Sequence, residues 1–300
     1  MIKASIITIG DELLIGQVLD TNSAWIAQQF NKAGIPIRRR VAVGDNWDDI
    51  WGALDAESRE SEIIMITGGL GPTSDDITKP LLCKYFGGKM IVNDEALENV
   101  KYLIQVVFQR PMIQSNLKQA EVPDTCKVIQ NKRGTAPGMW FEKEDHIFIS
   151  MPGVPYEMKG MVEEIIPILK DRFALPVIIH KTLLTAGVGE SFLAEKIKNF
   201  ETNLSQEIKL AYLPAFGMVR LRLSTMGYDA AKVEDSITAE FNKLLILVQE
   251  YVVTDEDEPL EKVVGKLLIR QKKMMATAES CTGGYLAHLI TRHPGASEYF

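Results

Sequence analysis

Short apolar runs alternate with amphipathic stretches over the first part of the chain. Residues 63–66, IIMI, form a continuous apolar run, which is the pattern of a strand that is covered on both faces of a sheet, and residues 4–9, ASIITI, are interpreted as a first buried strand. Between them, helical spacing of apolar residues predicts a helix over 21–34, alternation predicts a strand over 35–43, and a second helix is predicted over 46–60. This order predicts a three-layer α/β/α domain with a mostly parallel sheet.

The pattern changes further along the chain. Residues 93–117 predict a helical excursion, and residues 127–151 predict a hairpin that leads into a helix beginning at Tyr156. From about residue 176, a strand, a helix, two strands and a helix predict a small α+β domain, and a third α/β segment follows with a first strand at 276–278. The predicted boundaries are 1–172 for the first domain, 176–252 for the second, 253–259 for a charged linker and 260–300 for the beginning of the third.

The composition and net charge of the chain argue against several classes of function. A formal net charge of −7 argues against a sequence-independent nucleic-acid binder, which needs a basic face. Cys83, Cys126 and Cys281 are widely spaced and form no CxxC pair, so neither a disulfide framework nor a zinc site is indicated, and a reducing cytoplasm is the simpler setting. One early lysine, Lys3, is followed by charge at Asp11, which is too soon for the apolar core of a signal peptide, and no apolar run approaches membrane-spanning length. Neither export nor membrane insertion is therefore expected.

A glycine-rich turn follows the second apolar run. Gly68, Gly69 and Gly71 remove three β-carbons where the strand should end, so that backbone N–H groups can approach an anion closely. Asp75 and Asp76 follow, and a carboxylate pair beside a phosphate seat suggests a bound divalent cation. The alternative is a plain strand-to-helix turn in which the aspartates cap the next helix.

Comparable segments follow the other predicted strands. The predicted loop over 10–22 begins with Gly-Asp-Glu, the second strand runs into Asp45, and the strand before Tyr156 ends in a rigid turn at 152–155. In parallel sheets, ligands bind outside the carboxyl ends of the strands, so these segments are expected to share one crevice, which the loop 134–138 also approaches. This convergence favours a ligand-binding role for Asp76 over a capping role.

The chain resembles the CinA family in motifs spread over nearly its whole length. Its N-terminal part is similar to the N-terminal domain of that family, itself similar to the molybdopterin-binding domain of cofactor-synthesis proteins, in ITIGDELLIGQVLDTNSAWIA, VGDN, TGGLGPTSDDIT and MPGVPYEM. AGVGES and LAYLPAFGMVRLRL resemble the KH-like middle domain. ATAESCTGGYLAHLITRHPGASEYF resembles the opening of the C-terminal nicotinamide mononucleotide deamidase domain.

The first domain's resemblance implies hydrolysis of ADP-ribose to AMP and ribose 5-phosphate with a divalent metal, Mg²⁺, Mn²⁺ or Co²⁺. It implies catalytic and metal-binding roles for Asp11, Asp45 and Asp76. Asn22 could bind ribose or simply cap a helix. The implied substrate-binding residues are Gly10, Thr21, Asn22, Thr67, Gly68, Gly69, Gly71, Pro72, Thr73, Asp75, Pro152, Gly153 and Val154.

Two positions depart from the molybdopterin enzymes. Their turn usually reads TGGTG with an arginine before the catalytic aspartate, whereas Leu70 and Asp75 stand at those places here. Exchanging a cation for an anion favours a metal-bound diphosphate over a group held directly by arginine. Nucleotide hydrolysis is therefore the first hypothesis. The alternatives are a non-catalytic nucleotide- or molybdopterin-binding module and an interaction protein linked to competence or DNA damage.

The resemblance also bears on the later domains. Ser280 matches the serine that the family uses as the deamidase nucleophile, but the chain stops at Phe300 before the expected lysine and tyrosine, so this chain is expected to be a truncated form without deamidase activity. In the middle domain, residues 187–190 read GVGE, which is not the GXXG clamp that KH domains use on nucleic acid. A scaffold or dimer-contact role is expected there, with the protein a homodimer by family precedent.

Overall fold

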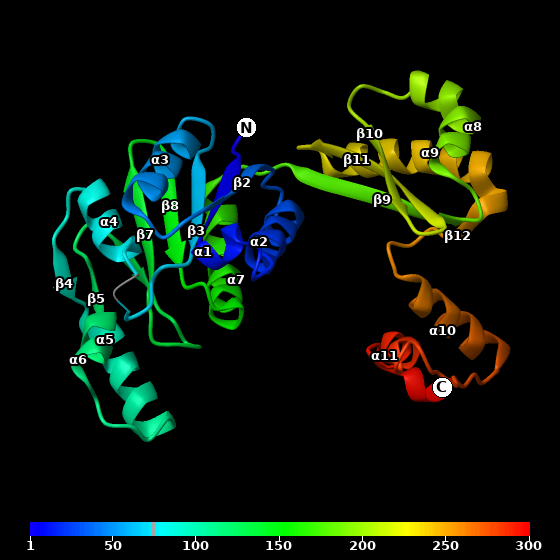
Figure 1. The fold of residues 1–300 in the computed structure, drawn as a ribbon. Coiled ribbons are helices and arrows are strands. Elements are labelled where there is room, and N and C mark those ends of the chain that lie inside the picture. Colours follow the sequence, from blue (N-terminus) through cyan, green and yellow to red (C-terminus); the bar gives the residue numbers. More distant parts are fainter. Residues whose placement is uncertain (74–75) are drawn as a thin grey trace. The chain divides into compact units, whose positions relative to one another are not determined.

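The computed structural model describes residues 1–73 and 76–300, and the chain divides into two compact units, Met1–Pro176 and Val177–Phe300 (Figure 1). None of the helices in these described residues is both long and apolar enough to cross a membrane. Each unit has its own sheet and its own core.

The first unit is built on a six-stranded sheet in the order β2-β1-β3-β8-β7-β6. The four strands β1, β2, β3 and β8 are parallel, whereas β7 is antiparallel to β8 and β6 is antiparallel to β7. The carboxyl ends of the four parallel strands therefore meet at one edge of the sheet. Their bounds are Ala4–Ile9 (β1), Ile37–Val43 (β2), Ile63–Thr67 (β3), Lys127–Ile129 (β6), Gly138–Lys143 (β7) and His146–Met151 (β8).

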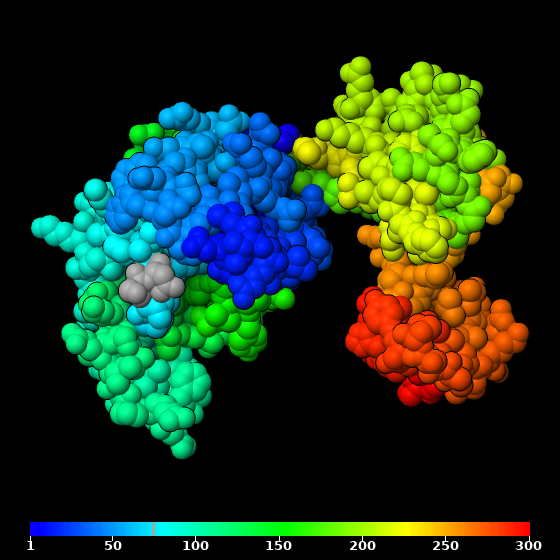
Figure 2. All heavy atoms as spheres, in the orientation of Figure 1, coloured from blue at the N-terminus to red at the C-terminus, as the bar shows by residue number. Residues whose placement is uncertain are grey.

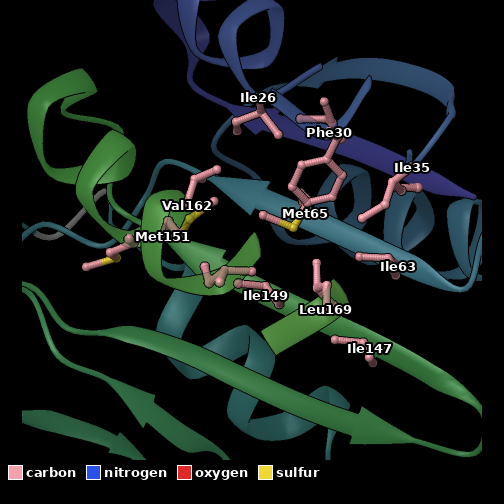
Figure 3. Close-up of a cluster of buried hydrophobic side chains, with 14 of the residues drawn as sticks. Ile26, Phe30, Ile35, Ile63, Met65, Ile147, Ile149, Met151, Val162 and Leu169 are labelled. Atoms are coloured by element: carbon pink, nitrogen blue, oxygen red, sulfur yellow. The ribbon is translucent and has the colours of Figure 1, made fainter. Parts of the chain in front are cut away.

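Helices cover both faces of this sheet because its central strands are apolar on both sides. On β3, Ile63 and Met65 pack into the core beneath α2 and α7, which is the cluster drawn in Figure 3, whereas Ile64 and Ile66 pack beneath α3 and α4. The three-layer α/β/α prediction is confirmed. The helix bounds are Thr21–Lys32 (α2), Trp47–Ser58 (α3), Thr78–Tyr85 (α4) and Pro155–Arg172 (α7).

Two regions of the first unit are more structured than expected. The predicted loop after β1 contains one helical turn, α1 (Asp11–Leu14). In this turn, the N–H of Ile15 donates to the carbonyl of Asp11 at 3.1 Å. A single turn is too short to leave a periodic pattern in the sequence. The helical excursion is present but interrupted, and a small two-stranded sheet flanks it. Its parts are β4 (Met90–Val92), α5 (Asp94–Lys101), a π-helix (Tyr102–Val107), α6 (Gln114–Gln119) and β5 (Glu121–Pro123).

The second unit has a four-stranded antiparallel sheet in the order β10-β11-β9-β12, with α8 and α9 packed on its apolar face. The strand β12 includes the first two residues of the predicted linker 253–259. The bounds are Val177–Ala186 (β9), Glu190–Thr202 (α8), Lys209–Ala215 (β10), Met218–Gly227 (β11), Ala230–Val248 (α9), Gln249–Tyr251 (η2), Val252–Thr254 (β12), Leu260–Gln271 (α10), Tyr285–Thr291 (α11) and Ala296–Glu298 (η3).

The prediction of a strand at 276–278 was wrong. These residues have no regular structure, and the described residues include no strand that pairs with them. The nearby backbone is instead held by the N–H of Met275, which donates to the carbonyl of Tyr299 at 2.8 Å. A short apolar run becomes a strand only where a neighbour supplies the ladder of hydrogen bonds.

Candidate functional site

A cavity of about 440 Å³ lies at the carboxyl edge of the parallel strands in the first unit. All four strand ends contribute to it, as does the β6–β7 loop. The space-filling view shows α1 and the turn after β3 on the same face of this unit (Figure 2). The lining residues are Ile9, Gly10, Glu12, Asp45, Gly68, Gly69, Leu70, Gly71, Pro72, Asp76, Gln119, Thr135, Ala136, Pro152, Gly153, Val154 and Glu157. The predicted shared crevice is therefore present.

The turn after β3 has no space for a side chain at Gly68 or Gly69. At Gly68, φ is +117° and a Cβ atom would lie 2.2 Å from the carbonyl oxygen of Ile9. At Gly69, φ is +64° and a Cβ atom would lie 2.1 Å from the Thr78 hydroxyl oxygen. Since both the backbone conformation and the close packing exclude a β-carbon, the glycines are required for this turn to lie against β1 and α4.

Asp76 folds back onto this turn. Its Oδ1 accepts the N–H of Gly71 at 2.8 Å, and its Oδ2 accepts the N–H of Thr73 at 2.9 Å and the Thr73 hydroxyl. The N-cap of α4 is Ile77, which has no side-chain hydrogen bond. The interpretation that Asp76 caps the following helix was therefore wrong, because its carboxylate organises the preceding turn.

These contacts decide which amides of the two loops are already paired. The N–H groups of Gly71 and Thr73 are bonded to Asp76, and that of Gly68 donates to the carbonyl of Met151 at 3.1 Å. In the described contacts, the N–H groups of Gly69, Leu70, Gly153 and Val154 have no acceptor, and all four residues line the cavity. These four amides, on two neighbouring loops, are the available seat for an anion.

Asp11 and Asp45 join the ends of β1 and β2. Each carboxylate accepts the backbone N–H of the other residue. Asp45 lines the cavity, and so does Glu12, whereas Asp11 does not. A Cβ atom at Gly44 would lie 2.7 Å from the Asp11 carboxylate, which is why a glycine precedes Asp45.

Asn22 occupies a smaller pocket of about 120 Å³ that shares Gly153 with the main cavity. Its Nδ2 donates to the carbonyl of Gly153 at 2.7 Å and to the Thr67 hydroxyl at 3.3 Å, and Thr67 donates to the carbonyl of Pro152. Its Oδ1 is buried without a partner. Asp20, not Asn22, is the N-cap of α2, so the capping interpretation of Asn22 was wrong.

Thr21 lines the same small pocket, and Pro72 lines the main one. Asp75 lies outside the residues that the structure describes. Ser280 belongs to the second unit, where it is exposed, and its hydroxyl makes no hydrogen bond to a described base. The neighbouring Glu279 caps α11 through the N–H groups of Leu286 and Ala287.

Two lining residues were not predicted from the sequence. Gln119 reaches the cavity from the end of α6, and Glu157 reaches it from the first turn of α7. Glu157 lies in the MPGVPYEM motif, two residues beyond the turn that was predicted to form a wall. Burial raises the pKa of Glu157, and a hydrogen bond from Asn131 opposes that rise.

The cavity wall is acidic. Glu12, Asp45, Asp76 and Glu157 line it, and no lysine or arginine is among its described lining residues. A buried cation contacts one lining residue: Lys79 is 7% exposed and donates to the carbonyl of Gln119 at 2.7 Å. Burial lowers the pKa of Lys79 to about 8, against the opposing charges of Glu121, Cys126 and Asp76.

Oxygen donors of this kind suit Mg²⁺ or Mn²⁺. Within the described chain, however, no three carboxylate, imidazole or thiol groups are arranged to hold a metal ion by themselves. Asp45 and Asp76 share the cavity, while Asp11 stands behind Asp45. A cation here would need further ligands from water or from a bound phosphate, which is how Mg²⁺ is commonly held at phosphate sites.

Three protein-family models match the chain. They are described as "Probable molybdopterin binding domain", over residues 5–171, "Damage-inducible protein CinA KH domain", over 180–253, and "CinA C-terminal domain", over 257–300. A CinA-like protein of Flavobacterium psychrophilum is 50% identical over 300 residues, which cover 99% of this chain and 72% of that protein. One of Cytophaga hutchinsonii is 46% identical, over 100% of this chain and 72% of that protein.

A solved structure agrees with the first unit. The crystal structure of the protein CinA of unknown function from Thermoplasma acidophilum is 32% identical to this chain, with a TM-score of 0.51. The match covers 57% of this chain and 98% of that one.

Proposed function

The chain belongs to the CinA family, and from that premise we propose that the crevice of its first unit hydrolyses the diphosphate bond of ADP-ribose, giving AMP and ribose 5-phosphate, with the help of a divalent cation. The family places a molybdopterin-binding-type domain at this position of the chain. The finer assignment, from that domain type to a diphosphate hydrolase, rests on the chemistry of the crevice.

The arrangement of Asp76 carries the proposal. Its carboxylate holds the glycine turn through three hydrogen bonds, so that the turn keeps one shape beside the cavity. The amides of Gly69 and Leu70 in this turn have no acceptor in the described contacts. The amides of Gly153 and Val154 complete the seat from the next loop. Four backbone donors without a charged side chain suit phosphate oxygens that also carry a metal ion.

The charge of the wall supports the metal requirement. A diphosphate is itself anionic, and a wall of four carboxylates without lysine or arginine would repel it. Asp45 and Asp76 are the residues that would hold the cation. When bound, the cation would neutralise charge on the phosphate oxygens and polarise the phosphorus toward attack by water.

The small pocket suits the sugar end of the substrate. The Oδ1 atom of Asn22 is a buried acceptor without a partner, and such an atom costs free energy until it receives a donor. A ribose hydroxyl entering beside Gly153 would supply that donor. Thr67 and Gly153 fix the amide of Asn22 in the orientation that leaves Oδ1 without a donor.

The test is turnover by the purified chain. ADP-ribose is incubated with Mg²⁺, Mn²⁺ or Co²⁺, and AMP and ribose 5-phosphate are separated by ion exchange. The wild-type chain is expected to form both products, and Asp76→Ala is expected to form neither above background. Binding of ADP-ribose by calorimetry without any product would instead establish a non-catalytic binding module. If the wild-type chain and Asp76→Ala are equally inactive on a panel of nucleoside diphosphates, that result would also favour a non-catalytic binding module.

A further inference from the structure

Glu157 is a second carboxylate of the crevice whose position is fixed by its surroundings. It lies in the first turn of α7, is half-buried and lines the same cavity as Asp76. Its Oε2 accepts a hydrogen bond from Nδ2 of Asn131 at 2.6 Å. In the described contacts, Oε1 has no hydrogen-bond donor, so one oxygen is anchored and the other is available.

The anchor of Glu157 is itself buried and braced. Asn131 is 2% exposed, and its Nδ2 also donates to the carbonyl of Ala136 at 2.9 Å, while Asn99 donates to the carbonyls of Asn131 and Gly134. A Cβ atom at Gly134 would lie 2.1 Å from the carboxyl carbon of Glu157, so the loop leaves room for this carboxylate by having glycine there.

The other carboxylates of the cavity have different surroundings. Both oxygens of Asp76 accept hydrogen bonds from the turn. The Asp45 carboxylate accepts the N–H of Asp11. Glu12 is exposed to solvent. Glu157 combines a half-buried position with an anchored Oε2 and an Oε1 that accepts no hydrogen bond in the described contacts.

We infer that Glu157 is the general base of the hydrolysis proposed for this crevice, taking a proton from the attacking water. This assignment rests on the proposed function. The water oxygen forms a bond to one phosphorus while the bond from that phosphorus to the bridging oxygen breaks, and its electron pair leaves with the bridging oxygen. One water proton passes to Glu157 and then to solvent, and the other stays on the new phosphate until that group ionises.

The surroundings of Glu157 support a base that is stronger than an exposed glutamate. Burial raises its pKa, as described above. Arg133, which packs beside α7, is held by the carboxylate of Glu163 at 2.8 Å, so the cation next to this seat is already paired with another residue.

The experiment compares Glu157→Gln with two matched carboxylates. Glu12→Gln changes another carboxylate of the same cavity, and Glu164→Gln changes an exposed glutamate of the same helix that pairs with Lys132. kcat and KM for ADP-ribose are measured from pH 5 to 9 with Mn²⁺. Glu157→Gln is expected to lower kcat by about 100-fold or more, the usual effect of losing a general base, and to change KM by less than about threefold. The acidic limb of the pH profile should disappear in this variant and persist in both controls.

Chemical rescue separates a base from a structural residue. In Glu157→Ala, added formate is expected to restore kcat by about 10-fold, because a small carboxylate can occupy the emptied seat, whereas Asp76→Ala should not respond. An acidic limb that persists in Glu157→Gln, loss of the limb in Glu12→Gln, or a variant in which only KM rises would each overturn the inference while leaving the hydrolase function intact. Absence of turnover by the wild-type chain would overturn the proposed function, and the inference with it.

Discussion

Asp11 and Asp45 exchange hydrogen bonds: the Asp11 carboxylate accepts the amide of Asp45 at 3.1 Å, and the Asp45 carboxylate accepts the amide of Asp11 at 3.0 Å. The pair joins the ends of two neighbouring strands, β1 and β2, just where the cavity begins. Of the two, Asp45 alone lines the cavity. The first prediction follows from this asymmetry.

Replacing either aspartate by alanine is expected to destabilise the first unit, and the two effects should not add. Each variant breaks one of two bonds that support each other, so a coupling energy of about 0.5–1.5 kcal/mol is expected in a double-mutant cycle. Asp45→Ala should lower kcat/KM for ADP-ribose more than Asp11→Ala does. Urea unfolding followed by tryptophan fluorescence gives the cycle, because all four tryptophans lie in the first unit. Strictly additive effects, or a larger activity loss in Asp11→Ala, would contradict this prediction.

Gly69→Ala is expected to cost much more stability than Gly87→Ala. The two glycines have nearly the same φ, +64° and +66°, but a Cβ atom at Gly69 meets Thr78 at 2.1 Å, whereas at Gly87 it meets nothing within 4 Å. The shared left-handed conformation costs about 1–2 kcal/mol in each variant, and the contact with Thr78 adds to it only at Gly69. The difference between the two free energies of unfolding therefore measures the packing of the turn. Equal losses would show that the turn relaxes without cost.

Asp76→Asn is expected to lower both stability and activity. An amide group cannot accept from Gly71 and Thr73 at once without facing one N–H with its own NH₂ group, and an unpaired donor costs about 1–3 kcal/mol. Activity on ADP-ribose should fall by about 100-fold or more, since the variant also loses a charge needed for the cation. Asp48→Asn, at an exposed position on α3, is the control. If Asp76→Asn retained the kcat/KM and the metal dependence of the wild-type chain, this role of Asp76 would be excluded.

The lowered pKa of the buried Lys79 predicts that the free energy of unfolding changes at alkaline pH. Its pKa is about 8 in the folded protein and 10.5 when unfolded, so between these values the unfolded chain binds more protons. Stability attributable to Lys79 therefore rises from pH 8 to 10.5, by about 3 kcal/mol, and is absent below pH 8. The difference in free energy of unfolding between wild type and Lys79→Met should follow this rise. Lys118→Met, an exposed neighbour of Gln119, serves as the control. A pH-independent difference for Lys79→Met would contradict the assignment.

The sheet was predictable because its central strands are apolar on both faces. The runs at β1 and β3 have no other stable place than the middle of a layered α/β domain, and the order of elements between them sets a parallel sheet. The prediction of a strand at 276–278 was wrong because a segment of three residues does not show whether a neighbouring strand is present to pair with it. The single turn of α1 was missed for a similar reason, since periodicity needs length.

The site was predictable as far as it is made by strand ends. Gly68, Asp45 and Gly153 follow parallel strands, so topology alone brings them together. Gln119 and Glu157 could not be found this way, because one lies at the end of a helical excursion and the other on a helix face. The direction of hydrogen bonds was also invisible in the sequence: Asp76 binds backward to the turn rather than forward to the helix.

The strand order gives the crevice a kinetic consequence. β8 pairs with β3, yet the whole excursion and the β6–β7 hairpin lie between them in the chain, so the wall at Gly153 forms only after a long loop has closed. A ligand that needs both strand ends binds the native state alone. It should therefore slow unfolding and leave the rate of folding unchanged, so that an occupied crevice lengthens the lifetime of the folded unit.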